Sequence, residues 1–133
     1  MSDWRMWIAQ AGVLLSVTAM VAMTVSGAEP PRKVLRHIVL YKFKDEVKPE
    51  QIEEVIAAFN ELPSKIDTII GYEHGINVSH EGKSEGLTHC FLVTFASQKD
   101  LDDYIKHPAH QEYVKIVRDR REKVVVCDFW AAP

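Results

Sequence analysis

Basic clusters, glycine-rich phosphate loops and zinc-ligand motifs are all absent from this chain of 133 residues. The formal net charge is −3, and the densest basic stretch, from Arg118 to Lys123, is interrupted by Asp119 and Glu122. A mildly acidic chain without a basic patch does not have the electrostatic footprint of a nucleic-acid-binding protein. No serine or cysteine stands in a recognisable activating context, and no internal repeat is present. We therefore predict a protein that binds no nucleic acid, no metal and no cofactor.

Long apolar runs are also missing, apart from one at the N-terminus, between Met6 and Val25. Arg5 precedes this run, and the small residues Ser26, Gly27 and Ala28 follow it. This is the pattern of a signal peptide with its cleavage site, so we predict a signal peptide over residues 1–28. The length of the run also suits an uncleaved membrane anchor, which needs ~20 apolar residues.

The remaining chain divides into a linker over residues 29–35 and one domain over residues 36–133. In both readings of the N-terminal segment the domain works outside the cytoplasm. We expect an exported protein, periplasmic or secreted, or alternatively one that the N-terminal segment anchors to the membrane.

Apolar periodicity predicts six elements in the order strand, helix, strand, strand, helix, strand. The expected strands cover residues 36–44, 69–78, 88–96 and 123–130. One helix is expected from Pro49 to Pro63, and a second, broken at Pro108, from about residue 97 to residue 120. This order is that of the α+β, ferredoxin-like βαββαβ fold, with a four-stranded antiparallel sheet in the order 4-1-3-2 and both helices on one face.

Two helices cover only one face of such a sheet, but the first and third strands carry large apolar side chains on both faces. We therefore predict that the uncovered face meets a second copy of the chain, which makes a homodimeric α/β barrel. The row of side chains expected inside this barrel consists of His37, Val39, Tyr41, Phe43, Phe91, Val93 and Phe95.

The two cysteines, Cys90 and Cys127, fall on strands that have another strand between them in this order. The two strands are then ~9.5 Å apart across the sheet. A disulfide needs Cα atoms within ~7 Å. We predict two buried free thiols with a structural role.

Two histidines and two tyrosines lie between Tyr104 and Tyr113, on either side of Pro108. Pro108 suits the first turn of a new helix, so two short helices are expected to meet at an angle there. Helical spacing points both Tyr104 and His110 inward at this corner.

The chain resembles the stress-responsive A/B barrel (Dabb) domain family of dimeric α+β barrels over nearly all of its mature length. The resemblance rests on five stretches: residues 37–45 (HIVLYKFKD), residues 75–79 (GINVS), residues 85–89 (EGLTH) with 93–95 (VTF), Tyr104 with residues 107–110 (HPAH), and residues 126–129 (VCDF). The resemblance implies the dimeric barrel, but it does not transfer a chemistry, since a shared fold hosts many functions.

Polyketide cyclases that are similar to this family use a tyrosine and a histidine as a catalytic pair, and the resemblance places Tyr104 and His110 at those positions. It also makes His37 and His89 similar to pocket histidines, although we read these two first as a hydrogen-bonded pair inside the barrel. His110 would act as the general base, and Tyr104 would donate a hydrogen bond to the enolate oxygen. The alternative is that His107 and His110 only cap backbone groups at the corner.

Three functions remain open. The first is an exported barrel that binds a small apolar or aromatic molecule, the second is an enzyme without a cofactor, similar to a polyketide cyclase or a monooxygenase, and the third is a purely structural, stress-related dimer. The candidate ligand-binding residues are His37, Val39, Tyr41, His89, Phe91, Tyr72 and His107.

Overall fold

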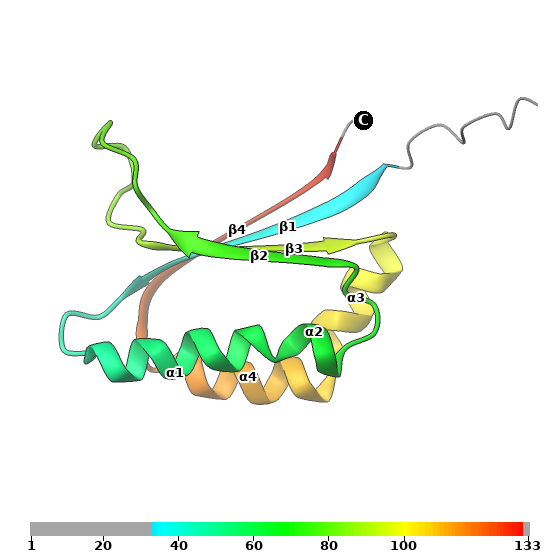
Figure 1. Cartoon of the computed structure of the whole chain (residues 1–133), viewed down its shortest axis with the longest axis horizontal. Helices are drawn as coiled ribbons and strands as arrows, with labels where there is room; N and C mark the ends of the chain where they lie inside the picture. Colours follow the sequence, from blue (N-terminus) through cyan, green and yellow to red (C-terminus); the bar gives the residue numbers. More distant parts are fainter. Residues whose placement is uncertain (1–32, 132–133) are drawn as a thin grey trace, which may run out of the picture.

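The computed structural model describes residues 33–131, and the predicted signal peptide lies outside them. The elements along the chain are β1 (Val34–Phe43), α1 (Pro49–Asn60), α2 (Leu62–Lys65), β2 (Gly71–Ile76), β3 (His89–Phe95), α3 (Gln98–Lys106), α4 (Pro108–Arg118) and β4 (Arg121–Ala131). Figure 1 shows one sheet lying above one layer of helices. The predicted ferredoxin-like α+β fold is confirmed, and β1 begins two residues earlier than expected.

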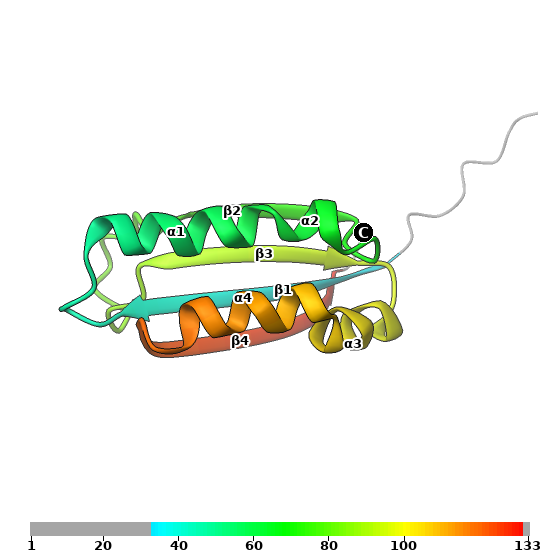
Figure 2. The same ribbon diagram turned by 90° about the horizontal axis from the view of Figure 1, so that it is seen from below.

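The sheet has four strands in the order β2-β3-β1-β4, and all neighbouring strands are antiparallel. This is the predicted order read from the other edge. In Figure 2, seen from below, α1 lies under the β2 and β3 side of the sheet and α4 under the β1 and β4 side. No helix within residues 33–131 is long and apolar enough to cross a membrane.

Proline decides where the helices begin. Pro49 and Pro108 each occupy the first turn of a helix, where the missing N–H costs nothing. Pro63 does not end the first helix as predicted, because α1 already ends at Asn60 and Pro63 lies in the first turn of α2. The Ser97 hydroxyl accepts a hydrogen bond from the Asp100 N–H at 3.1 Å and caps α3.

The prediction of which sheet face lies open is wrong. The aromatic row of β1 and β3 packs against the helices inside one chain and does not point away from them. Phe59 of α1 stacks on Phe91 with 4.3 Å between ring centroids, and the Tyr113 hydroxyl of α4 donates to the Tyr41 hydroxyl at 3.1 Å. Period-two alternation separates the two faces of a strand, but it cannot say which apolar face the helices cover when both are apolar.

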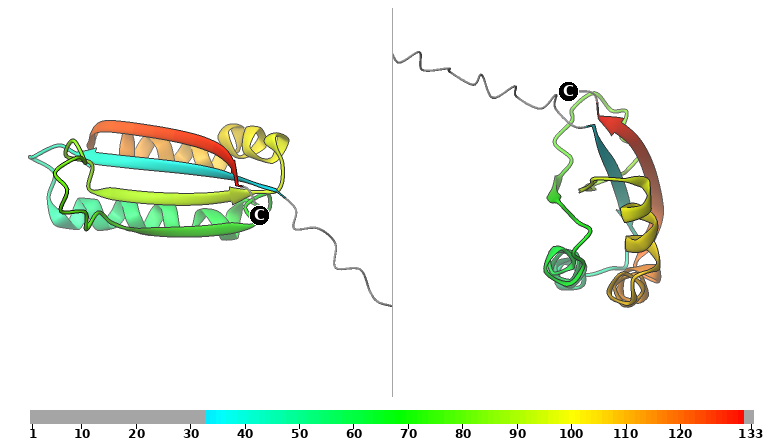
Figure 3. Two further views of the ribbon diagram at one scale, coloured as in Figure 1. Left: turned by 90° about the horizontal axis from the view of Figure 1, so that it is seen from above. Right: turned by 90° about the vertical axis from the view of Figure 1, so that its right-hand side faces the viewer.

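The central part of the uncovered face is nevertheless apolar, as the interpretation of the sequence required, although charged side chains such as Arg36, Lys42 and Glu73 flank it. Figure 3 shows this face of the sheet with the helices behind it. It carries the half-buried side chains Ile38, Leu40, Cys90, Leu92 and Val125.

Both cysteines are free thiols, as predicted. Cys90 is only half-buried and Cys127 is exposed, so the prediction of two buried thiols does not hold for the chain by itself. Both lie on the uncovered face, where only a second protein surface could bury them.

Candidate active site

A cavity of about 300 Å³ lies between the sheet and the corner formed by α3 and α4. Strands β1 and β4 form its floor, and the helices supply its walls. Its lining consists of His37, Val39, Tyr41, Phe59, Tyr104, Ile105, His110, Tyr113, Val114, Arg121, Val124, Val126 and Asp128. An apolar cavity that contains a few polar groups is the usual form of a small-molecule site.

Tyr104 and His110 lie side by side on this lining, with 4.4 Å between their ring centroids. The break at Pro108 produces this contact, because α3 ends at Lys106 and α4 starts in a new direction. The Nδ1 atom of His110 donates to the Ile105 carbonyl oxygen at 3.1 Å, which holds the ring and leaves Nε2 with its lone pair. The predicted inward orientation of both side chains agrees with the structure.

Burial acts on the two groups in opposite senses. It raises the pKa of the Tyr104 hydroxyl, whose side chain is only 1% exposed, and it lowers the pKa of the His110 imidazole. The Tyr104 hydroxyl therefore stays protonated and can donate a hydrogen bond, and His110 is neutral near pH 7 and can accept a proton. Within the described residues the Tyr104 hydroxyl makes no hydrogen bond, so it can donate one to a bound molecule.

His37 and Asp128 form a second polar pair in the cavity, and sequence reasoning missed the carboxylate. The two residues face each other across β1 and β4, and His37 Nδ1 lies 2.6 Å from Asp128 Oδ1. His37 is 6% exposed, and its ring meets that of Tyr104 edge-on at 5.7 Å. A signal existed, since Asp128 is a charged residue in the inward row that contains Val124 and Val126.

The predicted His37–His89 pair does not exist. The register of β1 and β3 places His37 opposite Val93 and His89 opposite Tyr41, four residues further along β1. His89 instead lies 2.8 Å from the Thr88 hydroxyl through its Nδ1 atom. Sequence periodicity identifies the face of a side chain but not its position along the neighbouring strand.

Of the seven predicted ligand-binding residues, three line the cavity: His37, Val39 and Tyr41. Phe91 is buried in the core beneath Phe59, and the Tyr72 hydroxyl donates to the Asn60 side chain at 2.8 Å. His107 caps α4, because its Nδ1 atom accepts from the Ala109 N–H at 3.1 Å. The capping role considered for His107 therefore describes its position, whereas His110 both bonds the backbone and lines the cavity.

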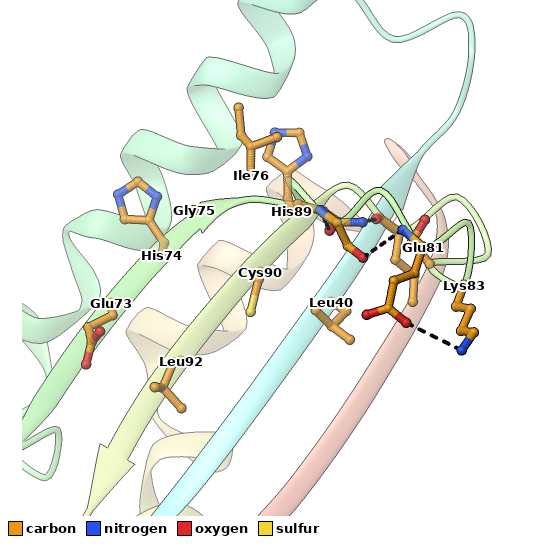
Figure 4. Close-up of a pocket in the computed structure, with 14 residues that line it drawn as sticks. Leu40, Glu73, His74, Gly75, Ile76, Glu81, Lys83, His89, Cys90 and Leu92 are labelled. Atoms are coloured by element: carbon orange, nitrogen blue, oxygen red, sulfur yellow. Dashed lines mark hydrogen bonds and ion pairs between the residues drawn. The ribbon is translucent and has the colours of Figure 1, made fainter.

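A second hollow, of about 690 Å³, lies on the uncovered face beneath the loop between β2 and β3. Figure 4 shows Leu40, Cys90 and Leu92 on this face, with the ion pair of Glu81 and Lys83 beside them. His89 belongs to this hollow and not to the cavity. Its lining has no group of three potential metal ligands, and neither does any other part of residues 33–131.

The ferredoxin-like sheet with its helices on one face, and the cavity at the α3–α4 corner, define an α+β protein of the barrel-forming class. The chain belongs to the stress-responsive A/B barrel domain family (Dabb), whose model matches residues 35–131. It is 38% identical over 101 residues to a stress-response A/B barrel domain-containing protein of Arabidopsis thaliana, covering 76% of this chain and 93% of that protein.

Two relatives are named as enzymes. Olivetolic acid cyclase of Cannabis sativa is 35% identical over 95 residues, covering 71% of this chain and 94% of the cyclase. The structure of hydroxynitrile lyase from Passiflora edulis superposes with a TM-score of 0.72 at 26% identity, covering 77% of this chain and 96% of the lyase. A dimeric ferredoxin-like protein from Jannaschia has a TM-score of 0.63 at 30% identity, covering 72% and 97%.

Proposed function

We propose that this protein is an enzyme that removes or adds a proton next to the carbonyl group of a small aromatic or apolar molecule, using its own side chains. The observation that carries the proposal is the placement of His110. Its Nδ1–H is held by the Ile105 carbonyl, and its ring contacts the buried Tyr104 phenol at the cavity wall. A neutral imidazole accepts the proton, and a phenol donates to the enolate oxygen that forms.

His37 and Asp128 support this assignment from the other side of Tyr104. The Asp128 carboxylate accepts the Nδ1–H of His37 and so orients this ring on the cavity lining. The names of two relatives, a cyclase and a lyase that the chain matches over nearly their whole length, support an enzymatic role. A cavity of about 300 Å³ favours a small molecule over a long chain.

The test does not depend on knowing the natural substrate. Acetophenone and similar aryl methyl ketones are incubated with the purified protein in D₂O, and exchange of the methyl protons is followed by NMR. We expect exchange that His110→Ala abolishes and that Tyr104→Phe slows by about 10²-fold, the size of one oxyanion donor. His80→Ala, which removes an exposed histidine of the β2–β3 loop, is the matched control.

A binding protein without catalysis is the second candidate, and one observation favours it. No hydrogen bond joins Tyr104 to His110 in the described part of the chain, and the backbone bonds of His107 and His110 stabilise the corner without any substrate. Ketone binding that is saturable, with exchange no faster in wild type than in His110→Ala, would establish this role in place of the enzyme.

The homodimer belongs to this proposal because the uncovered face of the sheet carries apolar side chains with nothing over them in one chain. The related Jannaschia protein is described as dimeric, and the second hollow lies on the same face. A face-to-face pair of sheets would bury Leu40, Leu92 and Val125 from both copies.

The proposal includes export of the protein from the cytoplasm. The N-terminal apolar run, followed by small residues at 26–28, is the observation that supports export. N-terminal sequencing of the protein from its native host should find a mature chain that starts at Glu29. An intact N-terminus in the membrane fraction would indicate the anchored form, and an intact N-terminus in the cytoplasm would contradict export.

A further inference from the structure

We infer that the molecule bound in the cavity carries a carboxylate, which Arg121 and the Tyr41 hydroxyl bind at the end of the cavity away from Tyr104. This inference rests on the proposed function, because it concerns the substrate of the same site. It adds the chemical class of that substrate and its orientation.

Among the described residues, Arg121 lines the cavity and has no carboxylate partner. Arg120 pairs with Glu54 at 2.7 Å, and Lys123 pairs with Glu85 at 2.5 Å. Within residues 33–131 Arg121 makes no such ion pair, although it is the one of these three that lines the cavity. Arg121 is partly exposed and its guanidinium lies near the Tyr41 ring, so its charge is available to bind an anion that enters the cavity.

Tyr41 supplies a second donor beside this cation. The Arg121 guanidinium carbon lies 5.9 Å from the centroid of the Tyr41 ring. The Tyr113 hydroxyl donates to the Tyr41 hydroxyl at 3.1 Å, so the proton of Tyr41 is free to be donated elsewhere. Within the described residues this proton has no acceptor. A phenol and a guanidinium that converge on one region match the two oxygens of a carboxylate, which is planar and accepts several hydrogen bonds.

The charges along the cavity also give the bound molecule a direction. Asp128 stands next to His37, and Arg121 stands next to Tyr41. His37 and Tyr41 are four residues apart on β1, which separates their Cα atoms by about 13 Å. A ligand anion is attracted at the Arg121 end and repelled at the Asp128 end. The reacting carbonyl group of the same molecule then lies near Tyr104 and His110.

The apolar middle of the cavity sets what lies between the two ends. Val39, Val124 and Val126 line this part. The charged residues of the lining, Arg121 and Asp128, lie at the two ends of the cavity. A benzene ring or a short unsaturated chain fits there, with a carboxylate at one end and the reacting carbonyl at the other. The expected substrate class is therefore an aromatic or conjugated keto acid.

The experiment compares two probes that differ only in charge, acetophenone and 4-carboxyacetophenone. Their dissociation constants are measured by ligand-observed NMR with the full purified protein, and exchange of the methyl protons is followed for each. We expect the carboxylate probe to bind more tightly than acetophenone. Arg121→Gln should weaken the carboxylate probe by about 10- to 100-fold, the range for hydrogen bonds to a charged group, and leave acetophenone unchanged.

Three further variants guard against a purely structural effect. Arg121→Lys should restore part of the preference, and Tyr41→Phe should weaken the carboxylate probe alone. Arg118→Gln removes an exposed cation at the end of α4 and serves as the control for net charge. Thermal unfolding of each variant shows that the domain is intact.

The outcomes separate this inference from the proposed function. If Arg121→Gln weakens both probes equally, or if the two probes bind equally well to wild type, the carboxylate site is wrong even when His110-dependent exchange is found. If the carboxylate probe binds through Arg121 without any exchange, the carboxylate site stands and the enzymatic role fails. If neither probe binds at millimolar concentration, both are wrong.

Discussion

Replacing Leu92 by lysine tests whether the uncovered sheet face is an interface. Leu92 lies on β3, opposite Ile38 of β1, and its side chain is half-buried in the single chain. A change at this position leaves the helix-covered core untouched, because its neighbours Phe91 and Val93 point to the other face.

The magnitude follows from burial. Complete burial of a leucine side chain contributes about 1.5–3 kcal/mol, of which at most about a third remains to be gained at Leu92, because most of this side chain is already buried in the single chain. A two-fold axis repeats each substitution, so the dimer loses up to about 1–2 kcal/mol from the two side chains, and burying the two lysine charges adds to this loss. The dissociation constant of the dimer should rise by about 5- to 30-fold from the lost leucine burial, and further from the lysine charges.

The assay is sedimentation or light scattering of wild type and Leu92→Lys over a range of micromolar concentrations. The wild type should show twice the mass of one chain, and the variant should shift to the monomer. Ile116→Lys changes an exposed isoleucine on α4, outside the uncovered face, and should not alter the mass. A monomeric wild type at micromolar concentration, or a variant that dimerises as well as wild type, refutes the reasoning about this face.

Three other changes probe the core and the cavity. Phe59→Ala removes a 1% exposed ring that stacks on Phe91, and it should lower the free energy of unfolding in urea by about 3–5 kcal/mol; a loss below 1 kcal/mol would show that this stack is not central to the core. Asp128→Asn weakens the hold on His37, so we expect exchange to slow by about tenfold with ketone binding unchanged, and an unchanged rate would remove His37 from the mechanism. Burial lowers the pKa of His110 from its ordinary value of 6.5, so the exchange rate should fall with decreasing pH with a midpoint below pH 6.5; a midpoint above pH 6.5 would contradict a His110 that is neutral near pH 7. The same shift makes the free energy of unfolding decrease as the pH falls below 6.5, because the unfolded chain then binds a proton that folded His110 resists.

Local patterns were sufficient for the four strands, for the two main helical segments and for their order, but not for the end of α1. The break at Pro108 and the alternation in β1 are short-range features, and each one lies where it was expected. The positions of Tyr104 and His110 follow from the same kind of information, since both depend on the spacing around one proline.

Contacts between side chains on neighbouring strands could not be predicted from such local patterns. His37 meets Asp128 and not His89 because the register of β1 with β3 and β4 depends on the packing of the whole sheet. The contact of Tyr41 with Tyr113 and Arg121 brings together three elements, and no spacing along the chain indicates it.

The sequence alone determined that the sheet has two apolar faces and that helices can cover only one of them, because alternation and element count are properties of the chain itself. Only the tertiary structure decided that the aromatic row lies beneath the helices and that the candidate site is therefore inside each protomer. The physical reason is that side-chain volumes from distant segments must fill one space together, and this fit is settled when the segments pack.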